Sequence, residues 1–505
     1  MQRPLAYLNN HTEYDWLIGC NSRQFQELVT KLYLELTQLL TNKTPPKIIL
    51  FEREPVRFLA GFIAACAAGC PVFLCNPDWG KQEWQQVFQL IQPDIIWGIA
   101  HKSQKIANVN NNQCPMPPSD DALYETLREH KLANAASPGS GNPPAALSYH
   151  APCLMPNTQC SIPNHIMIPT GGSSGQIKFA IHTWETLIAS VQGFTEYFQL
   201  KQVNSFCILP LYHVSGLMQF MRSFTTGGKL AVTSFKTIES GQKHKINPSD
   251  FFISLVPTQL QRCLQNPQLT EWLAQFQTVL LGGAPAWTEL LEKAKFHRIR
   301  LAPTYGMTET ASQIATLKPD DFLNGKISSG QILPHAQVTI RNQQGEVLSS
   351  HQTGNITIQA RSLALGYYPQ IEEDQNYLSV DDLGFLDEQG YLNIVGRNSD
   401  KIITGGENIY PIEIESAIQA TQMVIDVCVT GVPDQHWGQV LTALYIPKNS
   451  NTSNLEIQIL LKNKLSKFKI PKHWIPQQNL PRNSQGKINR QQLQQIAKKF
   501  LQNLS

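Results

Sequence analysis

The chain has 505 residues, of which 42% are hydrophobic and 16% are charged, and its formal net charge is +3. This length exceeds what one hydrophobic core holds, so we expect two to four domains. The near-neutral charge argues against an extended nucleic-acid or membrane surface, and we expect no nucleic-acid partner. The ten cysteines form no Cys-x-x-Cys pairs, and the N-terminus lacks a signal-peptide core; both features predict a cytoplasmic protein with reduced thiols.

The N-terminal region alternates between helical and strand patterns, which is typical of a parallel α/β sheet. The predicted elements are a helix at 22–42, a strand at 47–51, a helix at 55–68, a strand at 72–75, a helix at 81–90 and a strand at 95–98. Residues 58–75 carry no charge, and eighteen such residues reach the lower length limit of a membrane span. Gly69 and Pro71 interrupt this stretch, so we expect a buried helix followed by a strand and no transmembrane segment.

Residues 101–164 are polar and rich in Asn, Pro and Ser, which predicts an irregular surface connection. An apolar run at 165–168 then leads into Thr170-Gly-Gly-Ser-Ser-Gly-Gln-Ile-Lys178. Glycines let backbone N–H groups turn toward an anion, hydroxyls add donors, and a lysine adds charge. Taken alone, this stretch fits a polyphosphate site and a flexible surface loop equally well. It is not a P-loop, because no Gly-Lys-Ser/Thr closes it.

The α/β alternation resumes after this loop. The predicted elements are helices at 183–198, 216–224 and 258–264 and strands at 205–209, 229–233, 251–256 and 278–281. Polar or glycine-rich turns lie at 169–178, 210–216, 282–285 and 303–310. Ligands of open α/β sheets bind beyond the carboxyl ends of strands, so these turns predict one binding site.

The texture changes at about residue 329 to short alternating β runs, which predict a small β subdomain at about 329–397. After Gly396-Arg397 a new unit begins, with a helix from Pro411 and an apolar stripe on the last helix. We therefore expect a large N-terminal α/β domain at 1–397, which includes the β subdomain. A small, mobile α+β domain is expected at 398–505.

Six segments, in this order, resemble the adenylate-forming superfamily of acyl-CoA ligases, luciferases and adenylation domains, and the resemblance covers about residues 22 to 495. The six are Thr170 to Lys178, Leu209-Pro-Leu-Tyr-His213-Val-Ser-Gly, Leu281-Gly-Gly-Ala-Pro285, Tyr305-Gly-Met-Thr-Glu309-Thr, Asp382 to Arg397 running into Lys401-Ile-Ile-Thr-Gly-Gly-Glu-Asn-Ile, and Pro481-Arg-Asn-Ser-Gln-Gly-Lys487-Ile. The resemblance implies an enzyme that uses ATP and Mg²⁺ to convert a carboxylic acid into an acyl-adenylate. Coenzyme A then accepts the acyl group, and AMP and pyrophosphate are released.

The resemblance also implies roles for individual residues. Glu309 would hold Mg²⁺, and it belongs with Lys487, His213 and Thr308 in the implied catalytic set, in which Thr308 contacts the α-phosphate. Lys487 would approach the reacting carboxylate as a mobile cation. The implied nucleotide-binding residues are Thr170, Gly171, Gly172, Ser173, Ser174, Gly175, Lys178, Gly283, Ala284, Pro285, Thr304, Tyr305, Gly306, Asp382 and Arg397. Taken singly, most of these would be ordinary core, rim or solvated residues, and the multi-part match outweighs that interpretation.

In this superfamily the small domain rotates about a hinge just after the arginine that corresponds to Arg397. Rotation would move Lys487 away and bring the Gly405–Gly406 loop toward the acyl-adenylate. Many members have an acidic residue or a lysine two positions after the arginine, whereas this chain has Ser399, with Asp400 next. Either residue is therefore a candidate pivot. The chain stops near residue 505 without a carrier domain, which favours free coenzyme A.

Other positions depart from the superfamily pattern. Gly171 replaces a usual serine, Ile177 and Phe179 replace the proline and glycine around the loop lysine, and Val380-Asp381 replaces Thr-Gly before Asp382. The phosphate-loop departures motivate an alternative in which the chain is a catalytically silent nucleotide-binding protein. The retained charged residues of the six segments oppose that alternative.

Two segments look most similar to the ligases that activate o-succinylbenzoate in menaquinone and phylloquinone synthesis. They are Leu209-Pro-Leu-Tyr-His-Val-Ser-Gly-Leu and Thr304-Tyr-Gly-Met-Thr-Glu-Thr-Ala-Ser-Gln-Ile-Ala-Thr-Leu. That acid has a second carboxylate, which needs a cation or several donors when buried. Ser215 and Arg222 share a face of the predicted helix, and we expect them to recognise it with Ser312 and Gln313. A ligase for an aryl or medium-chain fatty acid is the alternative, and the oligomeric state stays open.

Overall fold

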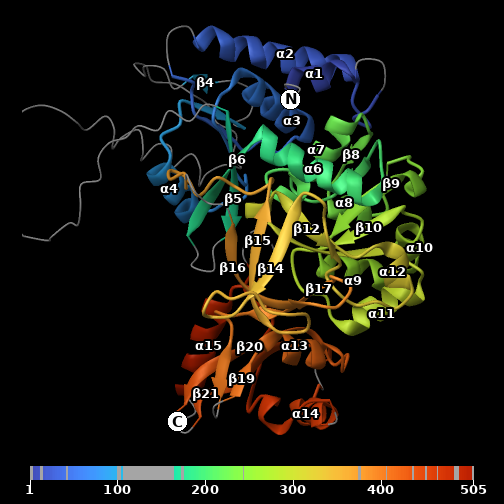
Figure 1. The fold of residues 1–505 in the computed structure, drawn as a ribbon, viewed down its shortest axis with the longest axis vertical. Coiled ribbons are helices and arrows are strands. Elements are labelled where there is room, and N and C mark those ends of the chain that lie inside the picture. The colour runs from blue at the N-terminus through green and yellow to red at the C-terminus, as the bar shows by residue number, and fades with distance from the viewer. Residues whose placement is uncertain are drawn as a thin grey trace, which may run out of the picture.

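The computed structural model describes residues 4–11, 15–40, 44–98, 104–105, 164–171, 176–242, 244–372, 377–404, 407–434, 437–449, 452–462, 464–482 and 488–502. These residues form four β-sheets with helices around them (Figure 1). Three sheets belong to a large N-terminal domain, and the fourth belongs to a small C-terminal domain at one end of the molecule (Figure 1). This mixed architecture confirms the predicted α/β fold class.

The first sheet has the strand order β4-β3-β1-β2-β5-β6. Strands β1, β2, β3 and β5 run parallel, and β4 and β6 pair antiparallel at the two edges. The elements of this region are α1 (Pro4–Asn9), α2 (Ser22–Leu39), β1 (Ile48–Leu50), α3 (Pro55–Ala68), β2 (Val72–Leu74), α4 (Lys81–Leu90), β3 (Ile95–Trp97), β4 (Gln104–Lys105), β5 (His165–Gly171) and β6 (Ile177–Thr183). The sheet ends at β6. The strands that follow, from β7 to β13, therefore form a second sheet and do not extend the first.

Helix α3 is the apolar stretch that raised the question of a membrane span. Glu54 caps its N-terminus by accepting hydrogen bonds from the backbone N–H groups of Val56 and Arg57, and Pro55 occupies the first turn. Gly69 ends it in the left-handed conformation, at φ 73°. In the described part of the chain, no helix has both the length and the apolar character needed to cross a membrane, and α3 is instead a buried helix, as predicted.

The second sheet has the order β13-β12-β11-β10-β9-β7-β8. It is parallel from β8 to β11, and β12 and β13 continue it antiparallel. Its elements are α6 (Trp184–Phe198), β7 (Asn204–Cys207), α7 (Val214–Thr226), β8 (Leu230–Val232), α8 (Phe235–Glu239), β9 (Phe251–Leu255), α9 (Pro257–Gln265), α10 (Pro267–Leu273), β10 (Thr278–Leu281), α11 (Thr288–Phe296), β11 (Leu301–Met307), β12 (Ser312–Thr316), α12 (Pro319–Leu323) and β13 (Gln331–Ile332). Because β10 and β11 run parallel, the segments that follow them lie at the same end of the sheet, beyond the carboxyl ends of the strands.

An antiparallel sheet of four strands follows, in the order β14-β15-β16-β17. Its strands are β14 (Ala336–Arg341), β15 (Gly354–Ala360), β16 (Leu378–Leu386) and β17 (Leu392–Arg397), which matches the β runs predicted from residue 329. The small domain has the strand order β19-β18-β21-β20, and β22 pairs parallel with β21. Its elements are β18 (Ile402–Thr404), β19 (Glu407–Ile409), α13 (Pro411–Gln419), β20 (Val424–Asp434), β21 (Gly438–Pro447), α14 (Asn454–Lys462), β22 (His473–Pro476) and α15 (Arg490–Gln502).

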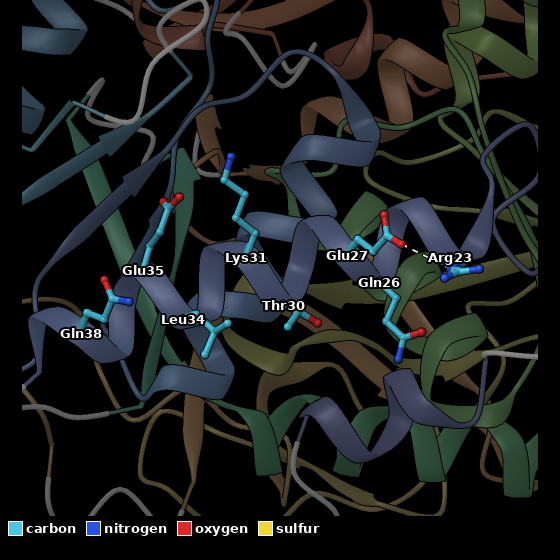
Figure 2. A pocket seen from close by; sticks show the side chains of 8 residues that line it. All are labelled: Arg23, Gln26, Glu27, Thr30, Lys31, Leu34, Glu35 and Gln38. Atoms are coloured by element: carbon cyan, nitrogen blue, oxygen red, sulfur yellow. Dashed lines mark ion pairs between the residues drawn. The ribbon is translucent and has the colours of Figure 1, made fainter.

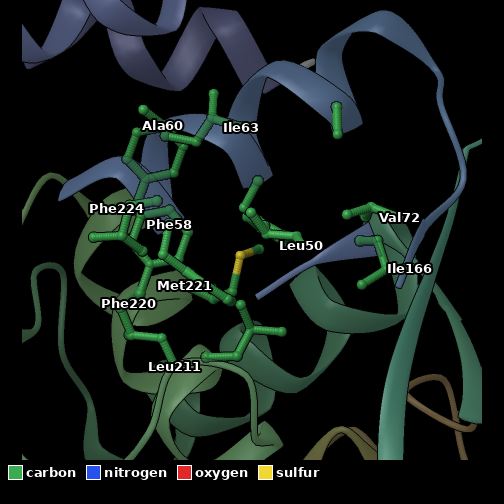
Figure 3. Close-up of a cluster of buried hydrophobic side chains, with 14 of the residues drawn as sticks. Leu50, Phe58, Ala60, Ile63, Val72, Ile166, Leu211, Phe220, Met221 and Phe224 are labelled. Atoms are coloured by element: carbon green, nitrogen blue, oxygen red, sulfur yellow. The ribbon is translucent and has the colours of Figure 1, made fainter. Parts of the chain in front are cut away.

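The largest hydrophobic core joins the first sheet to α7 through α3 (Figure 3). Phe58 and Phe62 of α3 are buried there, and the ring of Phe62 meets Phe220 of α7 edge-on with centroids 6.0 Å apart. Each such ring removes a large apolar area from water. This packing fixes α7 against the rest of the large domain, and α7 carries His213 at its N-terminus and Arg222 in its third turn.

Candidate active site

Two turns that were predicted to bind the nucleotide lie side by side at the carboxyl ends of β10 and β11. A Cβ atom at Gly282 would come within 2.6 Å of Thr304 Oγ1, and Gly283 has a left-handed φ of 81°. A Cβ atom at Gly306 would come within 2.1 Å of the Ser312 carbonyl oxygen. The position of Gly283 favours glycine because of its left-handed backbone, and that of Gly306 does so because the Ser312 backbone approaches it closely, whereas the close neighbour of Gly282 is the Thr304 side chain. The segment 283–285 and residues 304–306 of β11 therefore lie next to each other at the carboxyl end of the parallel strands.

Glu309 lies in a one-turn 3-10 helix, Thr308–Thr310, directly after β11. Its Oε1 atom accepts hydrogen bonds from Thr170 Oγ1 at 3.3 Å and from Tyr367 Oη at 2.6 Å. Thr170 pairs with Lys178 across the β5–β6 hairpin, and the Lys178 ammonium lies 5.4 Å from the ring centroid of Tyr367. The structure thus brings three of the predicted residues together: Thr170, Lys178 and Glu309. Gly171 ends β5, whereas Gly172, Ser173, Ser174 and Gly175 lie outside the described residues.

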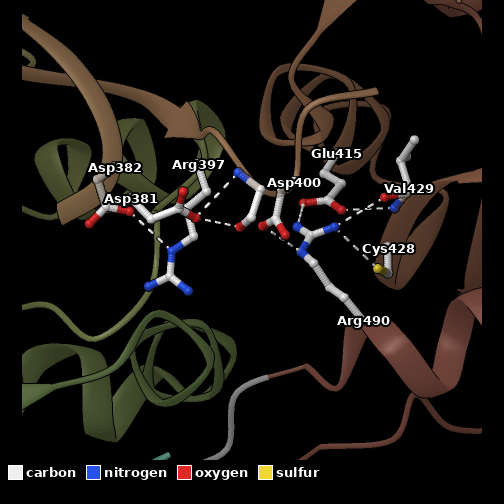
Figure 4. Close-up of polar contacts among 9 residues, drawn as sticks. Asp381, Asp382, Arg397, Asp400, Glu415, Cys428, Val429 and Arg490 are labelled. Carbon is white, nitrogen blue, oxygen red and sulfur yellow. Dashed lines mark hydrogen bonds and ion pairs between the residues drawn. The ribbon is translucent and has the colours of Figure 1, made fainter. Parts of the chain in front are cut away.

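Tyr305, Asp382 and Arg397 form a second cluster of predicted residues. The Tyr305 hydroxyl donates to Asp382 Oδ2 at 2.7 Å, and Arg397 Nε donates to Asp382 Oδ1 at 3.0 Å. Asp382 and Arg397 face each other across β16 and β17 (Figure 4). Burial and the Asp382 carboxylate raise the pKa of Tyr305, so its hydroxyl stays protonated and donates. One carboxylate therefore ties the end of β11 to the β16–β17 pair.

Thr308 is held by a histidine that the sequence did not single out. His182 Nε2 lies 2.8 Å from the Thr308 carbonyl oxygen, to which it donates, and Nδ1 lies 3.0 Å from Thr186 Oγ1. The ring is fully buried, and burial lowers the pKa of His182 to about 4. A neutral His182 therefore positions the backbone next to Glu309. A lone histidine in an apolar strand carries no local signal for such a role.

His213 precedes the first turn of α7 and is buried beside Tyr212, with ring centroids 4.5 Å apart. The turn before it is tight, since a Cβ atom at Gly216 would come within 2.1 Å of the Pro210 carbonyl oxygen. The structure therefore fixes His213 at the end of the loop that follows β7. Lys487 lies outside the described residues, as do Gly405 and Gly406.

Arg222 is the centre of a third cluster, in the interior of the large domain. It is 3% exposed, and its Nη2 atom donates to Ser312 Oγ at 3.1 Å and to Gln313 Oε1 at 2.8 Å. The guanidinium lies over the ring of Phe194, 4.2 Å from its centroid. Ser312 adopts a φ of 94°, a strained conformation for serine. Three of the four residues predicted to recognise the substrate acid are therefore in contact.

The fourth, Ser215, is exposed at the N-terminal end of α7. It shares a face with Arg222, but seven residues of helix separate the two by roughly 10 Å along the axis. The hydrogen bonds of the guanidinium go to β12 and not to Ser215. Contact of Ser215 with the same carboxylate as Arg222 is therefore not supported by the geometry, and its role stays a prediction.

The charge of Arg222 has no carboxylate partner among the described residues. Its Nε atom is buried without a hydrogen-bond acceptor, and burial lowers the pKa of the guanidinium to about 9. Burying a charge is costly unless it is paired or hydrogen-bonded. An anion bound at Arg222 would supply the missing partner.

The chain matches two family models. Residues 23–368 match the AMP-binding enzyme model, and residues 413–487 match the model of the AMP-binding enzyme C-terminal domain. The chain belongs to the AMP-binding enzyme family.

Relatives of this AMP-binding enzyme include the 2-succinylbenzoate–CoA ligase of Oceanobacillus iheyensis, 34% identical over 338 residues, which are 65% of this chain and 68% of the relative. The ligase of the same name from Listeria monocytogenes is 34% identical over 369 residues, 70% of this chain and 74% of the relative. The solved o-succinylbenzoate CoA synthetase of Bacillus subtilis, in complex with the acyl-adenylate OSB-AMP, has a TM-score of 0.75 at 23% identity over 96% of this chain and 97% of its own. Its complex with ATP and a magnesium ion has a TM-score of 0.74 at 22% identity over 96% and 98%. These structures show the shared fold.

The residues around Glu309 fit a magnesium ion that is held together with a nucleotide. The described residues contain no group of three or more His, Cys, Asp or Glu side chains that could hold a metal alone. Mg²⁺ is usually bound through one or two carboxylates and the phosphates of the substrate. Glu309 with the adjacent Thr170 hydroxyl is such an incomplete set, because the phosphates supply the remaining ligands.

A shallow hollow on the outer face of α2 plays no part in this site (Figure 2). Residues of that one helix line it, and they include the exposed ion pair between Arg23 and Glu27. None of the predicted site residues lies there.

Replacing Tyr367 by phenylalanine should slow acyl-adenylate formation roughly 10- to 100-fold, because a hydrogen bond to a charged group contributes roughly 1.5–3 kcal/mol. Burial and the Glu309 carboxylate raise the pKa of Tyr367, which keeps its hydroxyl a donor to Glu309. The phenylalanine ring keeps the contact with Lys178. Pyrophosphate release measured over a range of Mg²⁺ concentrations checks this prediction, and an unchanged rate would contradict it.

Acid should destabilise the fold because two buried histidines are held neutral. Burial lowers the pKa of His182 and of His335 to about 4, and the charges of Arg361 and Arg222 add to the effect at His335. Between pH 6.5 and 4 the unfolded chain binds protons that the native protein does not, so stability falls as the pH falls. The expected loss at pH 5 is roughly 2 kcal/mol for each histidine.

Urea unfolding at pH 7.5 and at pH 5.0 measures this loss. His335 is 4% exposed, and neither ring nitrogen has a hydrogen-bond partner among the described residues, so His335→Gln removes a titrating group without breaking a described bond. The variant should lose less stability on acidification than the natural chain. Equal losses in the two proteins would contradict the assignment of His335.

Proposed function

We propose that this AMP-binding enzyme is an ATP-dependent ligase that joins 2-succinylbenzoate to coenzyme A and releases AMP and pyrophosphate. The choice of acid rests on the buried Arg222 guanidinium, which has two polar neighbours in β12 and no acidic partner in the part of the chain that the structure describes. 2-Succinylbenzoate has two carboxylates, so one can react while the other pairs with Arg222. The identity to relatives that bear this name supports the same choice.

In the first half-reaction, an oxygen of the succinyl carboxylate attacks the α-phosphate of ATP and pyrophosphate leaves. Fixed cations and donors stabilise the charge on the transferred and departing phosphates. We assign phosphate binding to Thr170 and Lys178 and the binding of Mg²⁺ to Glu309, because Thr170 donates to Glu309 and Lys178 lies over the ring of Tyr367. The ion neutralises phosphate charge when bound. We assign to Lys487 and His213 the contacts with the reacting carboxylate.

We assign the nucleoside to the edge formed by the segment 283–285 and residues 304–306. Asp382 lies beside this edge, where Tyr305 and Arg397 hold its two oxygens. A carboxylate oxygen accepts more than one hydrogen bond, so Asp382 can still accept from the ribose hydroxyls. Asp382 is 8% exposed, and that burial strengthens such a bond.

In the second half-reaction, the thiolate of coenzyme A attacks the acyl carbon and AMP leaves. We propose that the small domain, residues 398–505, turns relative to the large domain, residues 1–397, between the two steps. The turn would exchange Lys487 for the loop that contains Gly405 and Gly406. The acyl group can then stay in the same pocket during both half-reactions.

A panel of acids tests this function. The purified chain is incubated with ATP, Mg²⁺, coenzyme A and 2-succinylbenzoate, benzoate or octanoate, and AMP and thioester are measured together. We expect both products from 2-succinylbenzoate alone. Thioester from an apolar acid instead would retain the ligase and reject the role of Arg222. Absence of AMP with each acid would favour the silent nucleotide-binding alternative.

A further inference from the structure

In the link between the two domains, neighbouring residues contact different domains: Ser399 contacts the large domain and Asp400 contacts the small one (Figure 4). The backbone N–H of Ser399 donates to Asp381 Oδ2 at 3.2 Å, and the Ser399 hydroxyl donates to the same oxygen. Asp381 belongs to β16 of the large domain. The next residue, Asp400, pairs instead with Arg490 of α15 in the small domain, with Oδ2 and Nε 3.1 Å apart. The bond between Ser399 and Asp400 is thus the point where the chain passes from one domain to the other.

The two attachments differ in strength. Arg490 also donates to Glu415 Oε2 at 2.9 Å and to the Val429 carbonyl oxygen at 3.0 Å, so Asp400 joins a part-buried network inside the small domain. Asp381 and Ser399 are both exposed. Exposed polar contacts contribute little and break easily, whereas breaking a buried charge network is costly. Asp381 binds both the N–H group and the hydroxyl of Ser399, so it restrains the φ torsion of that residue. A rotation of the small domain that turns this torsion breaks the Asp381–Ser399 contact, whereas Asp400 moves along with Arg490.

The orientation that this contact holds is the one suited to the first half-reaction. Helix α13 of the small domain faces the large domain next to β17, and a Cβ atom at Gly396 would lie 3.2 Å from the Tyr410 side chain. Strand β19, which forms a hairpin with β18 on either side of Gly405 and Gly406, lies farther from the large domain than α13 does (Figure 1). The second half-reaction requires that hairpin at the site.

We propose that Asp381 is a positioning residue which, through Ser399, latches the small domain in the adenylate-forming orientation. This inference rests on the proposed two-step reaction. Release of the latch should slow adenylate formation and should not slow thioester formation. The ratio of the two rates therefore reports on the latch, whereas a general structural defect lowers both rates together.

Single-turnover rates of the two half-reactions test the latch. Adenylate formation is followed as pyrophosphate release without coenzyme A, and thioester formation is followed from preformed adenylate with coenzyme A. We expect the ratio of the first rate to the second to fall at least threefold in Asp381→Ala and in Ser399→Ala, with no further fall in the double variant. Asp381→Asn, which keeps one acceptor oxygen, should be intermediate. A ratio that stays constant or rises would overturn the proposal.

Glu388→Gln is the matched control, since Glu388 is an exposed acid in the β16–β17 turn, away from the hinge. Hydrogen exchange provides a readout that needs no substrate. In Asp381→Ala the Ser399 amide and the α13 amides that face β17 should exchange faster than in the natural chain. Faster exchange at Ser399 alone would overturn the latch. A natural chain that forms no adenylate would reject the proposed function, while the exchange result would still decide whether Asp381 holds the small domain.

Discussion

Replacing Arg222 by leucine should lower kcat/KM for 2-succinylbenzoate roughly 100- to 1000-fold while ATP binding stays unchanged. Truncating one member of a buried charge pair costs about 2–5 kcal/mol, and each 1.4 kcal/mol is a factor of ten. Without the guanidinium, the free carboxylate of the acid would be buried against Ser312 and Gln313 with no cation. Steady-state kinetics and nucleotide titration measure the two quantities, and an unchanged kcat/KM would remove Arg222 from the acid site.

Stability separates this loss from misfolding. Burial disfavours the charge of Arg222 when no anion is bound, and it lowers the pKa of the guanidinium to about 9. Leucine fills the site without a charge, so the variant should unfold at the same temperature as the natural chain or at a higher one. Arg222→Lys keeps the charge but loses the planar fork, and it should be intermediate in kcat/KM.

The acid itself provides a second control. 4-Oxo-4-phenylbutanoate has the succinyl chain and the ring of 2-succinylbenzoate but lacks the ring carboxylate. The natural chain should use it poorly, and Arg222→Leu should use it as well as the natural chain does. A tenfold or larger loss on this analogue would mean that Arg222 acts on the fold or on the reacting group. It would then not be the residue that recognises the second carboxylate.

The sequence predicted those parts of the site that lie in contiguous motifs. Thr170 and Lys178 flank one glycine-rich loop, and their antiparallel pairing brings both near Glu309, which is 139 residues from Thr170. The helical period placed Arg222 on one face of the helix with Ser215, and in the structure the guanidinium donates to Ser312 and Gln313. Motif order and period carry this information because local backbone geometry positions neighbouring side chains.

The sequence did not predict the residues that act through long-range contacts. Tyr367 is 58 residues from Glu309, and His182 is 126 residues from Thr308, whose backbone it holds. A single tyrosine in a loop, or a single histidine in a strand, fits an ordinary structural position equally well. The division of the strands between two sheets was missed for a related reason. Strand order depends on which distant segments pair, and the alternation of helices and strands does not specify that.

Glu309→Gln should lower the rate of adenylate formation roughly 100- to 1000-fold, which corresponds to about 3–4 kcal/mol of transition-state stabilisation. The amide oxygen of glutamine can still accept from the Tyr367 hydroxyl and from Thr170, so the local structure is retained. What the variant loses is the negative charge that holds Mg²⁺ beside the phosphates. Pyrophosphate release at increasing Mg²⁺ concentrations should show a lower rate and a higher Mg²⁺ requirement.

The second half-reaction provides the internal control, because thioester formation from preformed adenylate consumes no ATP. Glu309→Gln should leave that rate within about twofold of the natural chain, since catalysis there concerns the acyl carbon and the thiolate. Tyr367→Phe should show the same selectivity with a smaller loss, because it keeps the carboxylate and removes only one donor to it. Equal losses in both half-reactions would instead make Glu309 a structural residue of the loop after β11, and the metal would then need another carboxylate.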